Sequence, residues 1–143
     1  PLKPILIQKA REENLSTLIF KDLSPKFEIV PFVQNALVSL VPLKQSVVLD
    51  TSSPNKLFES IAAGVPVIQN SCGWIKDYLS DNNLGYTINA SDAEGLVLKL
   101  VELDSKPNVF FEEFSSRAKL IAAKDFDKKN LANQMLNSML NIF

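Results

Sequence analysis

The sequence predicts a single α/β domain with a parallel sheet that is covered by helices on both faces. Short apolar runs alternate along the chain with longer amphipathic segments, which is the pattern of β-α-β units. The run at 36–43 is apolar at almost every position, as in a strand that is buried on both faces. The length of 143 residues fits one domain. A sheet of this class binds ligands beyond the carboxyl ends of its strands.

The predicted elements of the first half alternate between helix and strand. We expect a helix over 3–14 and a strand over 16–20. A second helix opens with Ser24 as its cap and Pro25 at its first position, and Pro31 should end or kink it. The strand at 36–43 follows.

The second half repeats the alternation and ends in helices. The predicted segments are a helix at 54–63 closed by a turn at Gly64, a strand at 66–70, a helix at 73–83, a strand at 84–89, and helices at 91–103, 107–124 and 127–143. Ser91 or Asp92 caps the helix at 91–103, with Glu94 completing a capping box if Ser91 is the cap. We expect core packing for the Phe110, Phe111 and Phe114 cluster and for the apolar stripe of the last helix, part of which can be exposed.

Composition excludes several functional classes. The chain has 15 basic and 16 acidic residues and no basic run, which argues against a nucleic-acid partner. It has no histidine and only Cys72, so Ser-His-Asp or Cys-His catalysis, histidine-ligated metals and an internal disulfide are excluded. No apolar run spans a membrane and no signal peptide is visible, so we expect a cytoplasmic protein. The chain opens on Pro1 rather than methionine, and we interpret it as a fragment.

The start of the helix at 54–63 is the candidate binding site. Ser53 is a suitable N-cap and Pro54 a suitable first residue. The amides of Asn55, Lys56 and Leu57 then have no acceptor within the helix and point out of its end. The helix dipole makes that end attractive to an anion.

The charges on this helix support that interpretation. Lys56 in the first turn opposes the helix dipole at a cost of about 0.3–1 kcal/mol, and a bound phosphate would reverse the sign of this effect. Glu59 lies one turn further along the same face, where its carboxylate could accept two hydrogen bonds from a vicinal diol. The spacing matches the phosphate and ribose of a nucleotide.

A structural interpretation of the same residues stays open. The segment could be a capped surface helix in which Lys56 and Glu59 form an i,i+3 pair of roughly 0.2–0.5 kcal/mol. The loop lacks the glycine-rich pattern of a P-loop or dinucleotide fingerprint.

Three stretches carry a resemblance to a known family. They are "SSPNKLFESIAAGVPVI", "GWIKDYLSDNNLGYTI" and the helix that starts at "SDAEGL". Together they resemble the C-terminal, nucleotide-sugar-binding domain of GT-B glycosyltransferases, and most closely the retaining family-4 branch of bacterial surface-polysaccharide synthesis. The resemblance implies a Rossmann-like doubly wound parallel sheet. It also implies that residues 1–143 are the donor-binding half, without the N-terminal acceptor domain.

The resemblance also implies roles for particular residues. Glu59 matches the glutamate that holds the donor ribose, and the loop from Ser52 to Leu57 matches the one whose amides contact the diphosphate and the sugar. The binding residues are therefore Ser52, Ser53, Asn55, Lys56, Leu57 and Glu59. A second family glutamate would fall on Thr51, so no acidic role is assigned there. The base is expected near residues 20–23. No catalytic residue is assigned, because the family's basic pair would lie upstream.

The implied activity is transfer of a hexose-type sugar from a nucleotide diphosphate sugar, with UDP as the expected nucleotide. The acceptor would be lipid-linked or a saccharide, in capsule, O-antigen or exopolysaccharide synthesis. We expect no metal and no cofactor, and the partners are the donor and the absent N-terminal domain. The complete enzyme could associate with the inner face of the membrane, and the fragment alone should be inactive.

Two alternatives remain open at this point. A nucleotide-sugar epimerase of the same fold would share the donor site but needs acid and base residues that the sequence does not offer. A non-enzymatic α/β module, such as a receiver-like domain, needs an acidic cluster, and Asp50 is the only acid near the key loop. Cys72 is interpreted as a loop or packing residue and Trp74 as the hydrophobic anchor of its helix.

Overall fold

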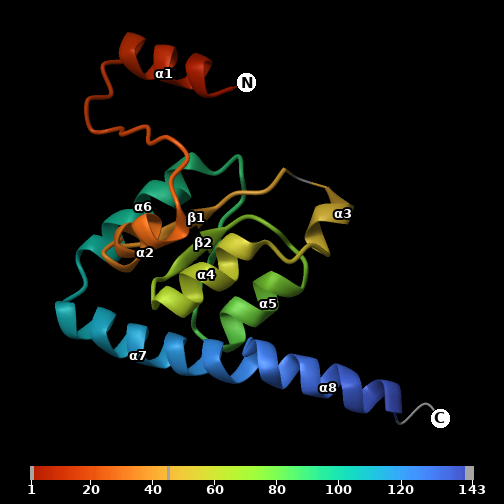
Figure 1. The fold of residues 1–143 in the computed structure, drawn as a ribbon. Helices are drawn as coiled ribbons and strands as arrows, with labels where there is room; N and C mark the ends of the chain where they lie inside the picture. Colours follow the sequence, from red (N-terminus) through yellow and green to blue (C-terminus); the bar gives the residue numbers. More distant parts are fainter. Residues whose placement is uncertain (1, 45, 141–143) are drawn as a thin grey trace.

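The computed structural model describes residues 2–44 and 46–140 and has a three-stranded parallel sheet at its centre. The strands are β1 (Ser39–Val41), β2 (Val67–Gln69) and β3 (Gly85–Thr87), in the order β1-β2-β3. The helices are α1 (Lys3–Glu12), α2 (Lys26–Gln34), α3 (Val47–Asp50), α4 (Asn55–Ala63), α5 (Trp74–Asp81), α6 (Ala93–Asp104), α7 (Asn108–Asp125) and α8 (Lys128–Leu140). Figure 1 shows the sheet surrounded by helices, with α7 and α8 along one side. The predicted α/β class with a parallel sheet is confirmed.

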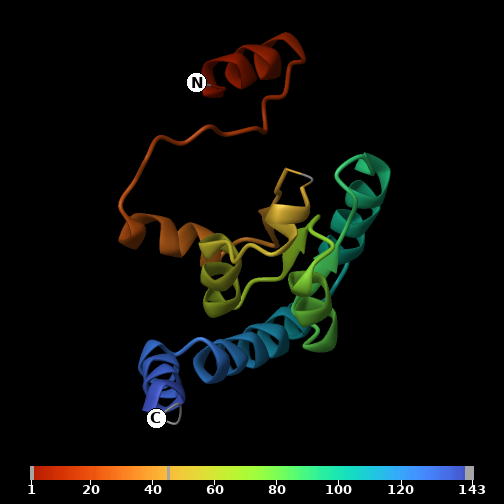
Figure 2. The ribbon, with the colours of Figure 1, turned by 90° about the vertical axis from the view of Figure 1, so that its right-hand side faces the viewer.

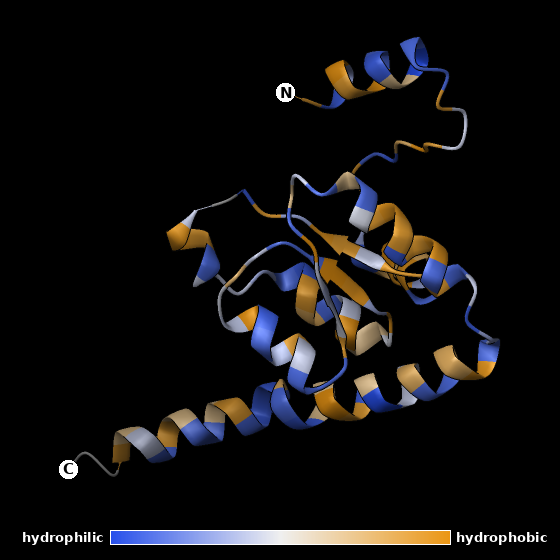
Figure 3. Cartoon of the chain, turned by 180° about the vertical axis from the view of Figure 1, so that it is seen from behind, coloured by the Kyte–Doolittle hydropathy of each residue, from blue (hydrophilic) through white to orange (hydrophobic). Residues whose placement is uncertain are grey.

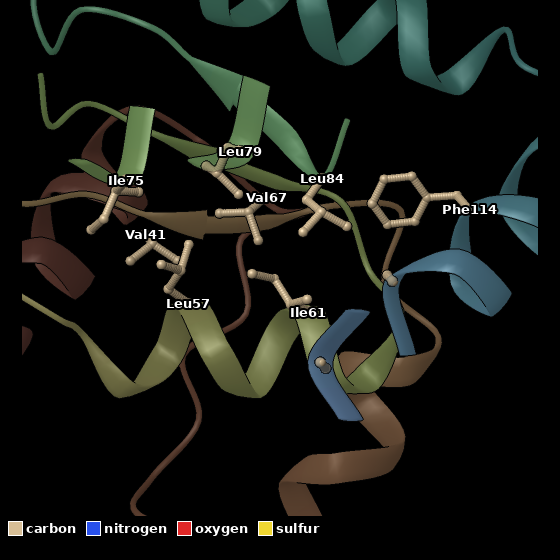
Figure 4. Close-up of a cluster of buried hydrophobic side chains, with 10 residues drawn as sticks. Val41, Leu57, Ile61, Val67, Ile75, Leu79, Leu84 and Phe114 are labelled. Carbon is tan, nitrogen blue, oxygen red and sulfur yellow. The ribbon is translucent and has the colours of Figure 1, made fainter. Parts of the chain in front are cut away.

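The hydrophobic core lies between the sheet and α4. Leu57 and Ile61 of α4 are fully buried and point toward Val41 and Val67 of the sheet (Figure 4). The neighbouring strand residues Leu40 and Ile68 point to the opposite face, where they line an apolar cavity together with Leu96 of α6. Helices therefore lie on both faces, as in a Rossmann-like half of a GT-B enzyme.

The helix α4 has an apolar face and an open polar face, as the sequence predicts. Asn55, Lys56 and Glu59 are exposed on its polar side. Gly64 ends the helix with a φ of 82°, a left-handed conformation that favours glycine. α7 packs along α4 and contributes Phe114 and Ala118 to the core. This packing fixes the direction in which α4 presents its first turn.

One strand predicted in the N-terminal segment does not form. Residues 16–20 form no strand, and this extended stretch joins α1 to α2 (Figure 2). Leu18 and Ile19 are 51% and 78% exposed, so no neighbouring strand or helix covers their side chains. Since a strand is stabilised by its ladder and by burial of one face, the apolar composition of this run is not enough to form one. α1 lies apart from the rest of the chain in both Figure 1 and Figure 2.

Two further predictions in this half are wrong in detail. α2 begins at Lys26 with Pro25 as its N-cap residue, so Ser24 is not the cap. Pro31 lies inside α2 and does not end it, and a kink at Pro31 stays a prediction. The strand predicted over 36–43 is only three residues long, and Leu40 is 49% exposed, so the strand is not buried on both faces.

The C-terminal helices lie where the sequence predicts them. Asp92, and not Ser91, caps α6 by accepting a hydrogen bond from the amide of Gly95 at 2.8 Å. Phe114 is buried while Phe110 and Phe111 are half-buried. The apolar side chains of α8 are exposed and do not form core. Figure 3 shows that hydrophobic and hydrophilic residues alternate along this helix. Phe143, at the end of the predicted stripe, lies outside the described residues. Among the described residues, no helix is both long and apolar enough to cross a membrane.

Candidate functional site

The segments that follow β1 and β2 meet at the carboxyl edge of the sheet. Asn70, directly after β2, joins them through its side-chain amide. Its Oδ1 accepts a hydrogen bond from the amide of Leu43 and its Nδ2 donates to the carbonyl of Leu43, both at 2.7 Å. The two loops are therefore held together at their origin, which is the edge where parallel sheets bind ligands.

Asp50 fixes the second contact between these loops. Its carboxylate oxygen Oδ1 accepts hydrogen bonds from the hydroxyl of Ser71 at 2.9 Å and from the amide of Cys72 at 3.0 Å. Gly73 lies directly against the backbone of Asp50, and a side-chain Cβ at this glycine would overlap the Asp50 carbonyl. The sequence "CGW" is thus explained by close backbone packing, and Cys72 has the loop role expected of it.

Trp74 anchors the loop immediately before α4. Its indole Nε1 donates a hydrogen bond to the carbonyl of Ser52 at 3.1 Å, and its ring stacks on Phe58 with centroids 6.2 Å apart. Trp74 packs through its ring as expected, but it is 37% exposed and its hydrogen bond and stacking join α5 to the loop and helix of α4. The ring of Tyr78 lies against Trp74, and the Tyr78 hydroxyl donates a hydrogen bond to Asp125 on α7 at 2.9 Å. Burial, and then the hydrogen bond to Asp125, raise the pKa of the Tyr78 phenol above its usual value.

The first turn of α4 differs from the prediction by one residue. Pro54 is the N-cap residue and Asn55 the first helical residue, and no side chain caps the helix. Ser53 is therefore not the cap. The amide of Leu57 donates to the Pro54 carbonyl at 3.0 Å, so it is not a free donor either. The amides of Asn55 and Lys56 have no acceptor among the described residues.

The predicted site residues lie together around this helix start. Ser53, Asn55 and Lys56 are exposed, whereas the side chain of Leu57 is fully buried in the core, leaving only its backbone near the helix end. The hydroxyl of Ser52 donates to the Leu49 carbonyl at 2.7 Å, which shapes the loop and leaves its lone pairs to accept. Thr51, where the family pattern would have a glutamate, uses its hydroxyl in the same way on Val48.

The ion pair at the site differs from the one expected if α4 were only a capped surface helix. Glu59 does not pair with Lys56. Its Oε1 lies 2.6 Å from the Nζ of Lys26, which comes from the start of α2. The carboxylate is 51% exposed, so it points to solvent and not into the core. Lys56 has no ion-pair partner among the described residues and remains the cation beside the open helix start.

Sequence reasoning missed Lys26, the hydrogen-bond partners of Asp50 and the short helix α3. Lys26 is 33 positions from Glu59 in the sequence, and only the packing of α2 against α4 brings the two together. The sequence shows Asp50 as the acid near the loop, but its hydrogen-bond partners come from the segment that follows β2. The glycine in "SCGW" was the available signal, because a glycine before a helix can mark a close backbone approach.

Metal-binding chemistry finds no support in the part of the chain that the structure describes. That part contains no group of three or more Cys, Asp or Glu side chains placed to hold a metal ion. The expectation that transfer needs no metal stays a prediction.

Comparison with known proteins identifies the family. A family model described as "Glycosyl transferases group 1" matches residues 5–105, which is more than half of the chain and includes the whole candidate site. This chain belongs to the group 1 glycosyltransferases. The membership favours a transferase over the epimerase and over the non-enzymatic module.

One curated relative is similar to this group 1 glycosyltransferase chain along almost all of its length. It is the protein of Salmonella typhimurium (strain LT2) named "Putative colanic acid biosynthesis glycosyltransferase WcaL", with 26% identity over 140 residues. The alignment covers 97% of this chain and 34% of the relative, so the chain spans about a third of the relative's length. No solved structure matches the chain significantly.

Proposed function

We propose that this chain is the donor-binding part of a glycosyltransferase that moves a hexose-type sugar from a nucleotide diphosphate sugar. UDP is the proposed nucleotide, retention the proposed stereochemistry, and a lipid-linked or saccharide acceptor the proposed second substrate. Because the relative is named for colanic acid biosynthesis, we place the reaction in bacterial surface-polysaccharide synthesis. The complete enzyme would work in the cytoplasm, at the inner face of the membrane.

One observation carries the proposal: α4 starts without a side-chain cap and presents Lys56 and Glu59 on the same exposed face. The amides of Asn55 and Lys56, the helix dipole and the Lys56 ammonium all favour a diphosphate at that point. The Glu59 carboxylate lies one turn along, within reach of a ribose diol. Lys26 occupies one oxygen of Glu59 and leaves the other available.

The chain would contribute electrostatic stabilisation to the reaction. The departing nucleotide diphosphate gains negative charge on its phosphate oxygens as the glycosidic bond breaks. Fixed amide donors and a nearby ammonium would stabilise that charge without a metal ion. No residue here is assigned as a nucleophile, and the acceptor would be bound by a part of the enzyme outside this chain. The 143-residue chain is therefore expected to bind the donor nucleotide without turning it over.

Isothermal titration with UDP tests the proposal. We expect the wild-type chain to bind UDP, and we expect Lys56→Ala and Glu59→Ala each to weaken binding by roughly tenfold, the loss typical of a charge-assisted hydrogen bond. Glu59→Ala should also abolish the preference for UDP over 2′-deoxy-UDP, since the deoxy compound cannot form the diol contact. Lys128→Ala, on exposed α8, is the matched control and should bind as wild type. Absence of UDP binding at millimolar concentration would contradict the proposal.

A further inference from the structure

A hollow lies beside the outer edge of β3 and shares no residue with the proposed donor site. It has a volume of about 670 Å³ and walls from α5, α6 and α7. We call it the β3 hollow and define it by Gly85, Tyr86 and Thr87 of the strand together with Lys76, Lys99 and Arg117. This volume is in the range of small-molecule pockets.

The charge of the β3 hollow has one sign. Lys76 comes from α5, Lys99 from α6 and Arg117 from α7, and none of the described residues that line the hollow is acidic. Lys76 and Arg117 have no carboxylate partner among the described residues, and Lys99 pairs with Glu102, which lies outside the lining. Three helices therefore place cations in the lining of one hollow, and two of these cations, Lys76 and Arg117, have no carboxylate partner among the described residues.

Two of these cations are held in place. The Nζ of Lys99 lies 4.3 Å from the centroid of the Tyr86 ring. The guanidinium of Arg117 lies 5.3 Å from the Phe114 ring centroid, and its Nη2 donates to the Asn83 carbonyl at 3.3 Å. Cations that rest on aromatic faces lose less conformational freedom when an anion binds.

The exposed edge of β3 adds neutral donors. Among the described residues, β3 pairs only with β2. The backbone hydrogen bonds that Leu84 and Ile88 make with β2 show that every second residue of this segment directs its backbone groups to β2. Gly85 and Thr87 therefore direct their amides to the other edge, toward the hollow. The Thr87 hydroxyl accepts from Gln69 at 2.7 Å and keeps its own proton to donate.

We propose that the β3 hollow is a second anion site that binds the phosphate groups of a small molecule. Phosphate oxygens accept several hydrogen bonds at once, which suits a set of donors that combines strand amides, a hydroxyl, two ammonium groups and a guanidinium. The site does not depend on the proposed donor function, because none of its residues lies at the start of α4.

Two-dimensional amide NMR of the whole chain with inorganic pyrophosphate tests this site. We expect the Gly85 and Thr87 amide resonances to shift in a saturable way. Arg117→Gln and Lys99→Gln should each weaken that titration by roughly tenfold. Lys124→Gln, an exposed lysine of α7 outside the hollow, is the matched control and should leave it unchanged.

The same spectra separate the two sites. Shifts of the Asn55 and Lys56 amides report the donor site, and they should not respond to Arg117→Gln. Competition by UDP would identify a nucleotide as the source of the phosphate, and competition by dihexanoyl-phosphatidylglycerol would identify a lipid headgroup. Pyrophosphate shifts confined to Asn55 and Lys56, or Gly85 shifts that persist in the Arg117→Gln/Lys99→Gln double variant, would overturn the inference.

Discussion

Two helices of this domain begin in opposite ways. At the start of α6, the Asp92 carboxylate accepts a hydrogen bond from the Gly95 amide at 2.8 Å, and Glu94 adds negative charge in the first turn. At the start of α4 there is no side-chain cap, no acid in the first turn, and a lysine at the second helical position. The α6 start places a carboxylate against the Gly95 amide and an acid in its first turn, whereas the α4 start has a lysine there and no side-chain cap.

The contrast matters because the two starts occupy different places in the fold. The α4 start is fixed by contacts with the segment after β2, through Asp50, Gly73 and Trp74. At α6 the cap is local, because the Asp92 side chain accepts from the amide of Gly95 three residues later. A helix start that these contacts fix in place, with a lysine in its first turn, is what the proposed donor site requires.

Among these variants, Gly73→Val should have the largest effect on the free energy of unfolding. It disturbs the loop contact that holds the start of α4 in place. A valine side chain would overlap the Asp50 backbone, so we expect overpacking to cost about 1–3 kcal/mol of unfolding free energy. UDP binding should fall with it, because the loop before α4 must move. Urea denaturation and titration measure the two effects. Cys72→Ala, at the exposed neighbour, should change neither, and wild-type behaviour of Gly73→Val would mean that the loop is not held by this contact.

Asp92→Ala should separate stability from binding. Loss of the α6 cap is expected to lower the free energy of unfolding by about 0.5–2 kcal/mol, since the Gly95 amide loses its acceptor. UDP affinity should be unchanged, and Asp92→Asn should recover most of the stability. A loss of UDP affinity in Asp92→Ala with the fold intact would show that the two helix starts are not independent.

Tyr78→Phe tests the attachment of α5, the helix that carries Trp74, to α7. Loss of the hydrogen bond to Asp125 should cost about 0.5–1.5 kcal/mol at neutral pH. The folded state raises the pKa of Tyr78 above its usual value of 10.0, so its stabilising contribution is complete below pH 10 and is lost as the pH rises further. Unfolding free energies of wild type and Tyr78→Phe should therefore converge in alkaline solution. A difference that grows above pH 10 would contradict this pairing.

Lys56→Glu should have the smallest effect on stability and an opposite effect on binding. An acid in the first turn complements the helix dipole, so the free energy of unfolding should rise by about 0.3–1 kcal/mol. UDP binding should weaken by roughly tenfold or more, because the diphosphate now meets a negative charge. Thermal melting and calorimetry give the two signs. If the free energy of unfolding and the UDP affinity changed in the same direction, the claim that Lys56 favours anion binding at the expense of helix stability would be contradicted.

The elements with strong local signals were predictable. The periodic stripe of Leu57 and Ile61, the Gly64 terminus and the exposed face of Glu59 all follow from helix geometry. The absence of a strand over 16–20 could not be seen in its apolar residues, because strand formation requires a partner that lies elsewhere in the chain. The same limit applies to the site. The exposure of Lys56 could be read from the sequence, but the pairing of Lys26 with Glu59 depends on how α2 packs against α4.

The most direct test of the account follows the amide resonances of both helix starts during a UDP titration. We predict large, saturable shifts for Asn55 and Lys56, whose amides are open, and no shift for Gly95, whose amide is bonded to Asp92. Shifts absent from Asn55 and Lys56 while the chain binds UDP elsewhere, or equal shifts at Gly95, would contradict the claim that the start of α4 is the diphosphate site.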